Sequence, residues 1–195
     1  MEWDGGTQME SLCIDFLNSD WRDWRGSGRR EDRLRKTEWL QSFLEAWGLQ
    51  APLPHSTDDP QIAELVELRI SLRRMVEAVA RGEDITSEDL AELNRVMAMA
   101  PSHQRIELRE NEYRLEQVSD TMGWNLVMAR IVESFADLLV HQEKRRLKIC
   151  DNQDCQWVYY DESRNRVRRW CDDKACGNLM KVRRFRERQK EKGEA

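Results

Sequence analysis

The sequence contains no long apolar run. Its most apolar stretch, residues 124–141, is interrupted by Arg130, Glu133 and Asp137, whereas a transmembrane helix needs about 20 predominantly apolar residues in succession. The amino-terminal residues are acidic and lack both the cationic start and the apolar centre of a secretory signal. We therefore expect no membrane span and a location in the reducing cytoplasm.

Histidine is also scarce. The three histidines, His55, His103 and His141, are scattered along the chain without a partner pattern, and an active site needs a nucleophile or an acid–base set brought together. We therefore do not expect an enzyme, and an active site in the amino-terminal part is the weakest of three functional hypotheses. Cys13 lies on the apolar face of a predicted helix, where a buried and inert thiol is expected.

The net charge of −5 conceals two segments of opposite sign. Residues 144–195 hold 16 Lys and Arg against 9 Asp and Glu, a net charge of +7, which leaves −12 for residues 1–143. Such asymmetry indicates that the short basic segment meets a polyanion. The alternative is that the charges segregate by chance or for docking within the molecule.

Hydrophobic periodicity in residues 1–143 is mostly helical. Met9, Leu12, Cys13, Phe16 and Leu17 share one helix face, and this helix should end near Asn18, before a loop at residues 21–30. Further start and stop signals predict four more helices: Thr37 as a cap with Gly48 as a stop, Asp59-Pro60 with Gly82, Thr86 and Asp89 with Pro101, and a start at Asp120 or Thr121. Alternation at residues 105–118, around a turn containing Asn111, predicts one β-hairpin.

Four cysteines form the strongest motif in the chain. They occur as Cys150-x4-Cys155 and Cys171-x4-Cys176, separated by fifteen residues. Two such pairs suit the tetrahedral thiolate set of a structural Zn²⁺, which leaves no coordination position for a catalytic water. Two disulfides would not persist in a reducing cytoplasm, and four unconnected thiols would not show this pairwise spacing.

The segments around these cysteines predict a small finger. Gln156–Tyr160 and Arg166–Trp170 are candidate strands on either side of a polar turn, and Asn178 is suited to cap a helix that runs to about Lys192. The order knuckle, hairpin and helix is that of a treble-clef-like finger. We expect a mainly α fold with a helical domain at residues 1–143, which folds independently, and a zinc finger at residues 144–195.

Two segments carry a family resemblance. They are LCIDFLNSDWR at residues 12–22, and LKICDNQDCQWVYYDESRNRVRRWCDDKACGN followed by KVRRFRERQK at residues 147–190. The chain resembles the bacterial CGNR-type zinc-finger proteins, whose larger amino-terminal domain is called ABATE. The resemblance implies a sensor-like domain joined to a zinc finger in a stress-related transcription regulator. Leu179 stands where the name-giving motif has arginine, so any role of that arginine is absent or displaced to Lys181 or Arg183.

The basic segment supplies candidate nucleic-acid contacts. On the predicted last helix Lys181, Arg184 and Arg188 share one face, while Leu179, Val182 and Phe185 are expected to anchor the helix to the finger. Phosphate neutralisation by such a face gives salt-dependent binding, most plausibly to duplex DNA. The full set of candidates is Arg166, Arg168, Arg169, Lys181, Arg183, Arg184, Arg186 and Arg188. The alternative is a solvated charged tail that frays beyond Gln189.

A ligand site is a separate hypothesis. Trp21 and Trp24 lie among arginines in a polar loop, where aromatic and guanidinium groups could enclose an anionic or planar effector. The alternative is that the tryptophans cover a helix end and the arginines pair with nearby acidic residues. Asp15, Asn18 and Trp21 are the candidate ligand contacts.

These observations favour a ligand-responsive or stress-responsive regulator that binds DNA through its finger. The second hypothesis is a zinc-stapled module that binds RNA or another protein, and it uses the same basic surface. DNA readers with one short module often act as dimers to reach a second half-site, so a homodimer is also considered.

Overall fold

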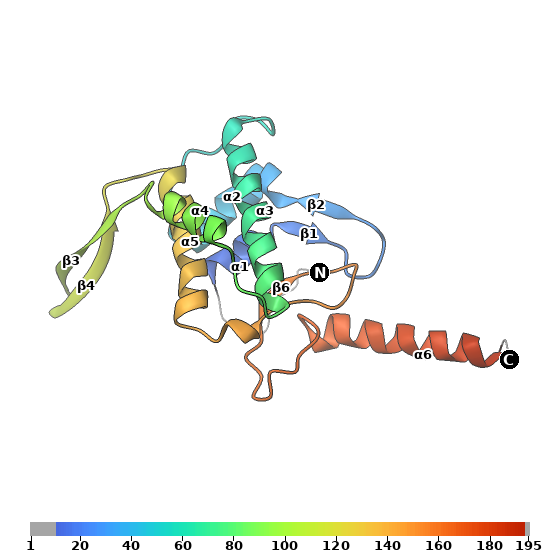
Figure 1. The fold of residues 1–195 in the computed structure, drawn as a ribbon. Coiled ribbons are helices and arrows are strands. Elements are labelled where there is room, and N and C mark those ends of the chain that lie inside the picture. Colours follow the sequence, from blue (N-terminus) through green and yellow to red (C-terminus); the bar gives the residue numbers. More distant parts are fainter. Residues whose placement is uncertain (1–10, 194–195) are drawn as a thin grey trace.

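Five helices pack into one apolar core in the computed structural model, which describes residues 11–193. Phe16, Leu72 and Phe135 are almost completely buried at its centre. Met9, which the sequence placed on the first helix, lies outside the described residues. The helices are α1 (Leu12–Leu17), α2 (Thr37–Ala46), α3 (Pro60–Ala80), α4 (Ser87–Met97) and α5 (Trp124–Val140), arranged as in Figure 1.

Local signals set most helix ends. The Asp59 carboxylate accepts a hydrogen bond from the Gln61 backbone N–H, and Thr86 and Asp89 form the reciprocal bonds of a capping box. Two predicted starts were wrong. Lys36, and not Thr37, occupies the cap position of α2, and α5 begins at Trp124 because Gly123 has a positive φ of 73° that no helix continues through.

The segment predicted as a loop at residues 21–30 is flanked by two paired strands. β1 (Asp20–Arg22) and β2 (Arg30–Asp32) are antiparallel, and the Asp20 carboxylate accepts hydrogen bonds from Arg30 across the pair. The single hairpin expected in residues 1–143 was therefore too few, since the described part of that segment contains two paired sheets, this one and the one at residues 102–119. Strands of three residues are too short to show an alternating pattern. The short 3₁₀ turn η1 (Arg33–Arg35) connects β2 to α2.

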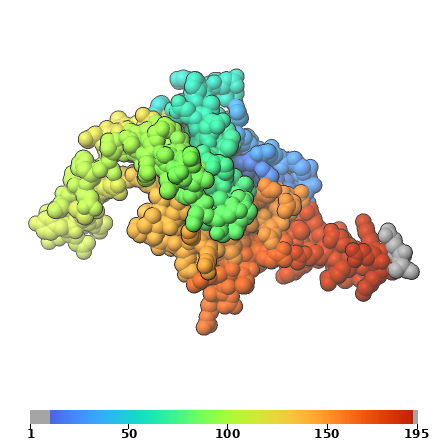
Figure 2. Space-filling model, viewed as in Figure 1, coloured from blue at the N-terminus to red at the C-terminus, as the bar shows by residue number. Residues whose placement is uncertain are grey.

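The predicted hairpin forms a projecting arm. β3 (Ser102–Arg109) and β4 (Glu112–Ser119) pair in register from Ser102↔Ser119 to Arg109↔Glu112. Glu110 and Asn111 both have positive φ, as a two-residue turn of this hand requires. Figures 1 and 2 show the arm extending away from the helices on the side opposite to the last helix of the chain.

The first strands of the cysteine segment belong to the same core as the helices. After the 3₁₀ turn η2 (Lys144–Arg146), β5 (Leu147–Ile149) pairs with β6 (Val158–Tyr160). Leu147, Val158 and Tyr160 are buried in the cluster formed by the helices. The boundary at residue 143 thus divides the sequence, but the apolar core continues across it.

Asn18 joins the two parts most directly. Its side-chain Nδ2 donates to the Val158 carbonyl at 2.9 Å, and the Val158 N–H donates to Asn18 Oδ1 at 2.8 Å. Asn18 is only 4% exposed. On the edge of β6 that does not face β5, a side-chain amide therefore takes the place of a neighbouring strand. Nearby, Arg73 of α3 donates to the Gln156 carbonyl at 2.8 Å.

Within residues 11–193, no helix combines the length and the hydropathy that crossing a membrane requires.

We predict that Asn18→Ala destabilises the whole protein. The substitution leaves the buried N–H and carbonyl of Val158 without partners, and each such group costs about 1–3 kcal/mol. Denaturant unfolding should show one transition at lower denaturant, followed in parallel by tryptophan fluorescence and zinc release. The matched control is Asn94→Ala on the exposed face of α4, which should change stability little. Two separate transitions in the wild-type protein would contradict unfolding of the two parts as one unit.

Candidate metal centre and basic surface

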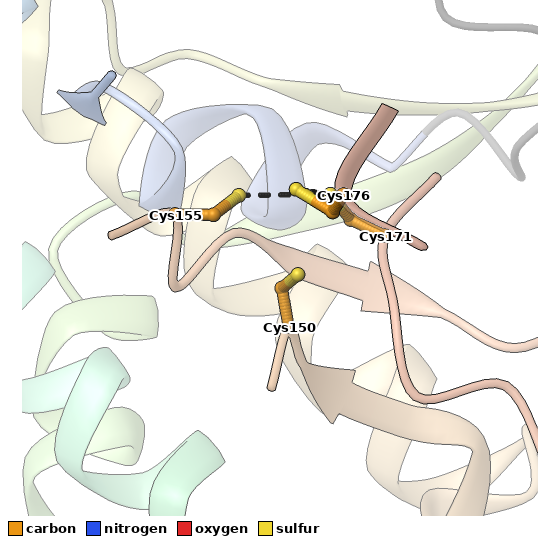
Figure 3. Close-up of side chains that lie close together, drawn as sticks. All are labelled: Cys150, Cys155, Cys171 and Cys176. Carbon is orange, nitrogen blue, oxygen red and sulfur yellow. Dashed lines mark hydrogen bonds between the residues drawn. The ribbon is translucent and has the colours of Figure 1, made fainter. Parts of the chain in front are cut away.

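Four cysteine thiols converge on one point. Cys150 follows β5, Cys155 lies in the turn before β6, and Cys171 and Cys176 come from the carboxy-terminal part of the finger. Their sulfur atoms all lie within 4.8 Å of one another, and all four residues are buried. Figure 3 shows the side chains turned toward a common centre.

This geometry fits a zinc ion. Two sulfurs that each lie about 2.3 Å from a tetrahedral centre are about 3.8 Å apart, and the observed separations are 3.6 Å for Cys155 and Cys171 and 3.9 Å for Cys171 and Cys176. Hydrogen bonds with the other three thiols lower the pKa of Cys150, whereas the hydrogen bond with Cys150 raises the pKa of Cys155 and that of Cys171. Four thiolates in this volume therefore need a cation, and the cysteines of this zinc finger supply a complete tetrahedral set for Zn²⁺.

Cys13 is the one cysteine outside the cluster. It lies in α1 with its side chain fully buried, and burial raises the pKa of its thiol to about 11. The expectation of an unreactive core thiol agrees with this environment, because the thiolate is the reactive form.

Asn152, which lies between Cys150 and Cys155 in the sequence, supports the metal centre through hydrogen bonds. Its Nδ2 lies 3.4 Å from Cys176 Sγ and donates to the Trp24 carbonyl at 2.8 Å, while its Oδ1 accepts from the Asp154 N–H. Asn152 is completely buried. Sequence reasoning missed this residue, although an asparagine two positions after the first cysteine is a recognisable turn former.

The predicted pairing of Gln156–Tyr160 with Arg166–Trp170 was wrong. β6 pairs with β5, and residues 166–170 form no strand. Side chains hold that segment: Lys148 Nζ donates to the carbonyls of Arg166 and Arg168, and the Asp161 carboxylate accepts from the Arg168 N–H. The resulting order is a hairpin knuckle, an irregular loop and a helix.

Asp161 is the buried charge of this loop. It accepts hydrogen bonds from Lys148 Nζ at 2.6 Å and from the Ser163 hydroxyl at 2.6 Å. Burial by itself would raise the pKa of Asp161, but the hydrogen bonds from Lys148 and Ser163 outweigh burial and lower the pKa to about 2. The carboxylate is therefore ionised at neutral pH, and it organises the loop that leads to Cys171.

The last helix begins earlier than predicted. The wide turn η3 (Asp173–Gly177) carries Cys176 and continues directly into α6 (Asn178–Gly193). Asp172 caps this turn, and Asn178 already has helical dihedral angles. A Cβ at Gly177 would lie 3.0 Å from the Trp170 ring, so glycine allows this tryptophan to pack beside the metal centre.

α6 is anchored by Met180 and Arg183. Met180 packs against the cysteine cluster, and Arg183 bonds to the Asp154 carboxylate at 2.6 Å and to the Arg25 carbonyl at 2.9 Å. Gly26 of the loop between β1 and β2 lies directly against this contact. The expected anchors Val182 and Phe185 are instead largely exposed, the latter at 56%. Beyond its first turns the helix extends into solvent (Figure 1).

The eight candidate nucleic-acid residues have different environments. Arg166 pairs with Glu143, Arg169 pairs with Asp151, and Arg168 donates to the Cys171 carbonyl. Arg183 serves as the anchor described above. Four residues are exposed on α6 and make no ion pair with any residue between 11 and 193: Lys181, Arg184, Arg186 and Arg188.

The ligand candidates have structural partners. Asn18 supports β6, Asp15 accepts a hydrogen bond from Trp47 Nε1 at 2.9 Å, and the Arg33 guanidinium lies 5.8 Å from the centre of the Trp21 ring. The structure therefore gives each of the three a packing or hydrogen-bonding role.

Two open clefts lie elsewhere, at the finger. One, of about 530 Å³, separates α3 from the finger, and the other, of about 440 Å³, lies beside Trp170. Neither is lined by Asp15, Asn18 or Trp21, while Arg168 and Arg169 line both. The cations that line the larger cleft are Arg73, Arg81, Arg145, Lys148, Arg168 and Arg169.

We predict one zinc per chain, held by Cys150, Cys155, Cys171 and Cys176. Cys155→Ser should abolish stoichiometric zinc in the purified protein, because removing one thiolate breaks the tetrahedral set. Cys13→Ser is the matched control, since that thiol lies in the helical core, and it should keep one zinc. Elemental analysis provides the measurement, and a metal-free wild-type protein would contradict the prediction.

A second prediction concerns the loop charge. Asp161→Ala leaves Lys148 and several buried donors without their acceptor, so the free energy of unfolding should fall by about 3–5 kcal/mol. Asp151→Ala breaks a solvent-exposed pair with Arg169 and should cost no more than about 1 kcal/mol. Urea unfolding at neutral pH separates the two variants, and equal losses would show that Asp161 has no special role.

Comparison with protein families agrees with this arrangement. The family model ABATE, described as "Putative stress-induced transcription regulator", matches residues 10–142, and the model of the CGNR zinc finger matches residues 146–189. Comparison with curated proteins returned no match. These two matches are to a regulator family and a zinc-finger family, not to enzyme families. The first match covers the helices of the core and the second covers the four cysteines, so the chain belongs to the ABATE family with a carboxy-terminal CGNR zinc finger.

Proposed function

We propose that the protein is a transcription regulator that binds duplex DNA through its zinc finger and α6. The observation that carries the proposal is the row of exposed cations on α6 that form no ion pair with any residue between 11 and 193. Lys181, Arg184 and Arg188 recur at helical spacing on a helix that Arg183 and the metal centre fix to the body. A rigid basic helix of this kind offers phosphates a preformed partner.

The charge distribution supports the same surface. Residues 1–143 carry a net charge of −12 and residues 144–195 a net charge of +7. A polyanion is therefore attracted to the carboxy-terminal segment and repelled by the rest of the molecule. Arg168 and Arg169 line both clefts beside the finger. These clefts would extend the contact of α6 with a phosphate backbone.

Effector sensing is the second part of the proposal. The larger cleft is bounded by α3 on one side and by the finger on the other. An anionic ligand there would contact both parts, so its binding free energy would depend on how they are arranged. This cleft is a better candidate than the region around Trp21, because the cleft is open and is lined by six cations against two carboxylates, Glu77 and Asp151.

DNA binding is tested first with random-sequence duplex selection, using the zinc-loaded full chain. Fluorescence anisotropy on an enriched duplex should then show affinity that falls with salt. Arg184→Ala and Arg188→Ala should each weaken binding and reduce the slope of log affinity against log salt by about one unit, because one phosphate contact is lost.

The matched control is Arg95→Ala, which removes an exposed arginine that pairs with Glu92 on α4 and should leave the slope unchanged. Preference for single-stranded RNA over duplex would favour RNA binding. Absence of nucleic-acid binding at low salt, in the wild type and variants alike, would overturn the proposal in favour of a protein-interaction module.

A further inference from the structure

The arm formed by β3 and β4 has one bare apolar face. Opposed residues in an antiparallel pair project to the same side, and the register pairs Ile106 with Leu115 and Leu108 with Tyr113. These four side chains are 70%, 61%, 59% and 81% exposed respectively. Figure 2 shows the arm standing clear of the helices, so the described residues 11–193 leave this face uncovered.

The other face of the arm carries charged side chains that form ion pairs with one another. Arg105 and Arg109 both pair with Glu107, Arg109 also pairs with Glu116, and Arg114 pairs with Glu112. Charges that neutralise one another within the hairpin offer little to a charged partner. The surface that is open for recognition is therefore the apolar one, and it requires an apolar counterpart.

We propose that the counterpart is the same face of a second copy, so that two arms pack face to face in a homodimer. Two apolar hairpin faces can stack at about 10 Å, as sheets do in a sandwich. A two-fold axis makes such a contact self-complementary, because each residue meets its partner residue reciprocally. The apolar face of each arm thus binds the same face of the second copy.

The exposed apolar area of the arm is large enough for a second copy of the chain to bind there. The four side chains expose on the order of 500 Å² per copy, which is as large as the biggest apolar patch on a typical monomer. Two copies would bury on the order of 1,000 Å² in all, the size at which a specific interface becomes plausible. An isolated two-stranded hairpin is also marginally stable in water, and stacking against a second hairpin would stabilise it.

The position of the arm is compatible with the rest of the molecule. It projects from the side of the body opposite to α6 (Figure 1), so pairing of the arms leaves the metal centre and the basic helix of each copy uncovered. The inference stands independently of DNA binding, because it uses none of the basic residues.

The test is the mass of the full-length zinc-loaded protein in solution, measured by sedimentation or light scattering over a wide concentration range. The wild type should have twice the 23.2 kDa of one chain, and high salt should not dissociate it, because the contact is apolar. Ile106→Thr combined with Leu115→Thr should give the mass of one chain, about 23.2 kDa, since threonine keeps the strand propensity while removing most of the apolar surface.

The matched control is Glu107→Thr combined with Arg114→Thr, a cross-strand pair on the opposite face of the same strands, which should remain dimeric. Zinc content and the thermal transition of each variant establish that it is folded. A monomeric wild type at every concentration would overturn the inference and leave a different protein as the occupant. A dimer that both variants retain would also overturn it, because the interface would then lie elsewhere.

Discussion

The pairing of Asn18 with Val158 is the contact on which the arrangement of the molecule depends. One side-chain amide at the end of α1 satisfies both backbone groups of a strand residue 140 positions away. That contact fixes β6 against the helices, and β6 follows the first cysteine pair. These two hydrogen bonds between one side-chain amide and the backbone therefore help to set the position of the metal centre relative to the helical core, because hydrogen bonds tolerate little change in distance or angle. The ABATE part and the finger match two separate family models, but their buried side chains form one apolar core.

Much of this architecture was accessible from sequence. The capping box at Thr86 and Asp89, the turn at Asn111 and the four zinc ligands each depend on local chemistry over a few residues. The pairing of β6 with β5 was not accessible, because β5 has only three residues, too few to show an alternating pattern. The segment expected to pair with β6, residues 166–170, is held instead by side-chain bonds from Lys148 and Asp161. The anchoring of α6 was also misjudged, since Val182 and Phe185 look like a packing face while Arg183 forms the contact.

The candidate ligand residues illustrate the same limit. Asp15, Asn18 and Trp21 are polar and aromatic residues in the segment that carries the family resemblance, and the structure gives them partners within the fold. A motif can be distinctive because it closes an interface between distant parts of the chain. The basic cleft between α3 and the finger, in contrast, is built from residues with no common motif, and only the folded arrangement brings Arg73 and Arg169 to one surface.

The shared core has a consequence for module exchange. Zinc fingers are often treated as units that can be transplanted between proteins, yet here Leu147, Val158 and Tyr160 fill space inside the helical body. A chimera that joins this finger to an unrelated domain would leave those side chains and the Val158 backbone facing water, and the donor body would keep a matching hole. A functional graft would have to carry α1 with the finger, because Asn18 supplies the hydrogen bonds that the Val158 backbone needs.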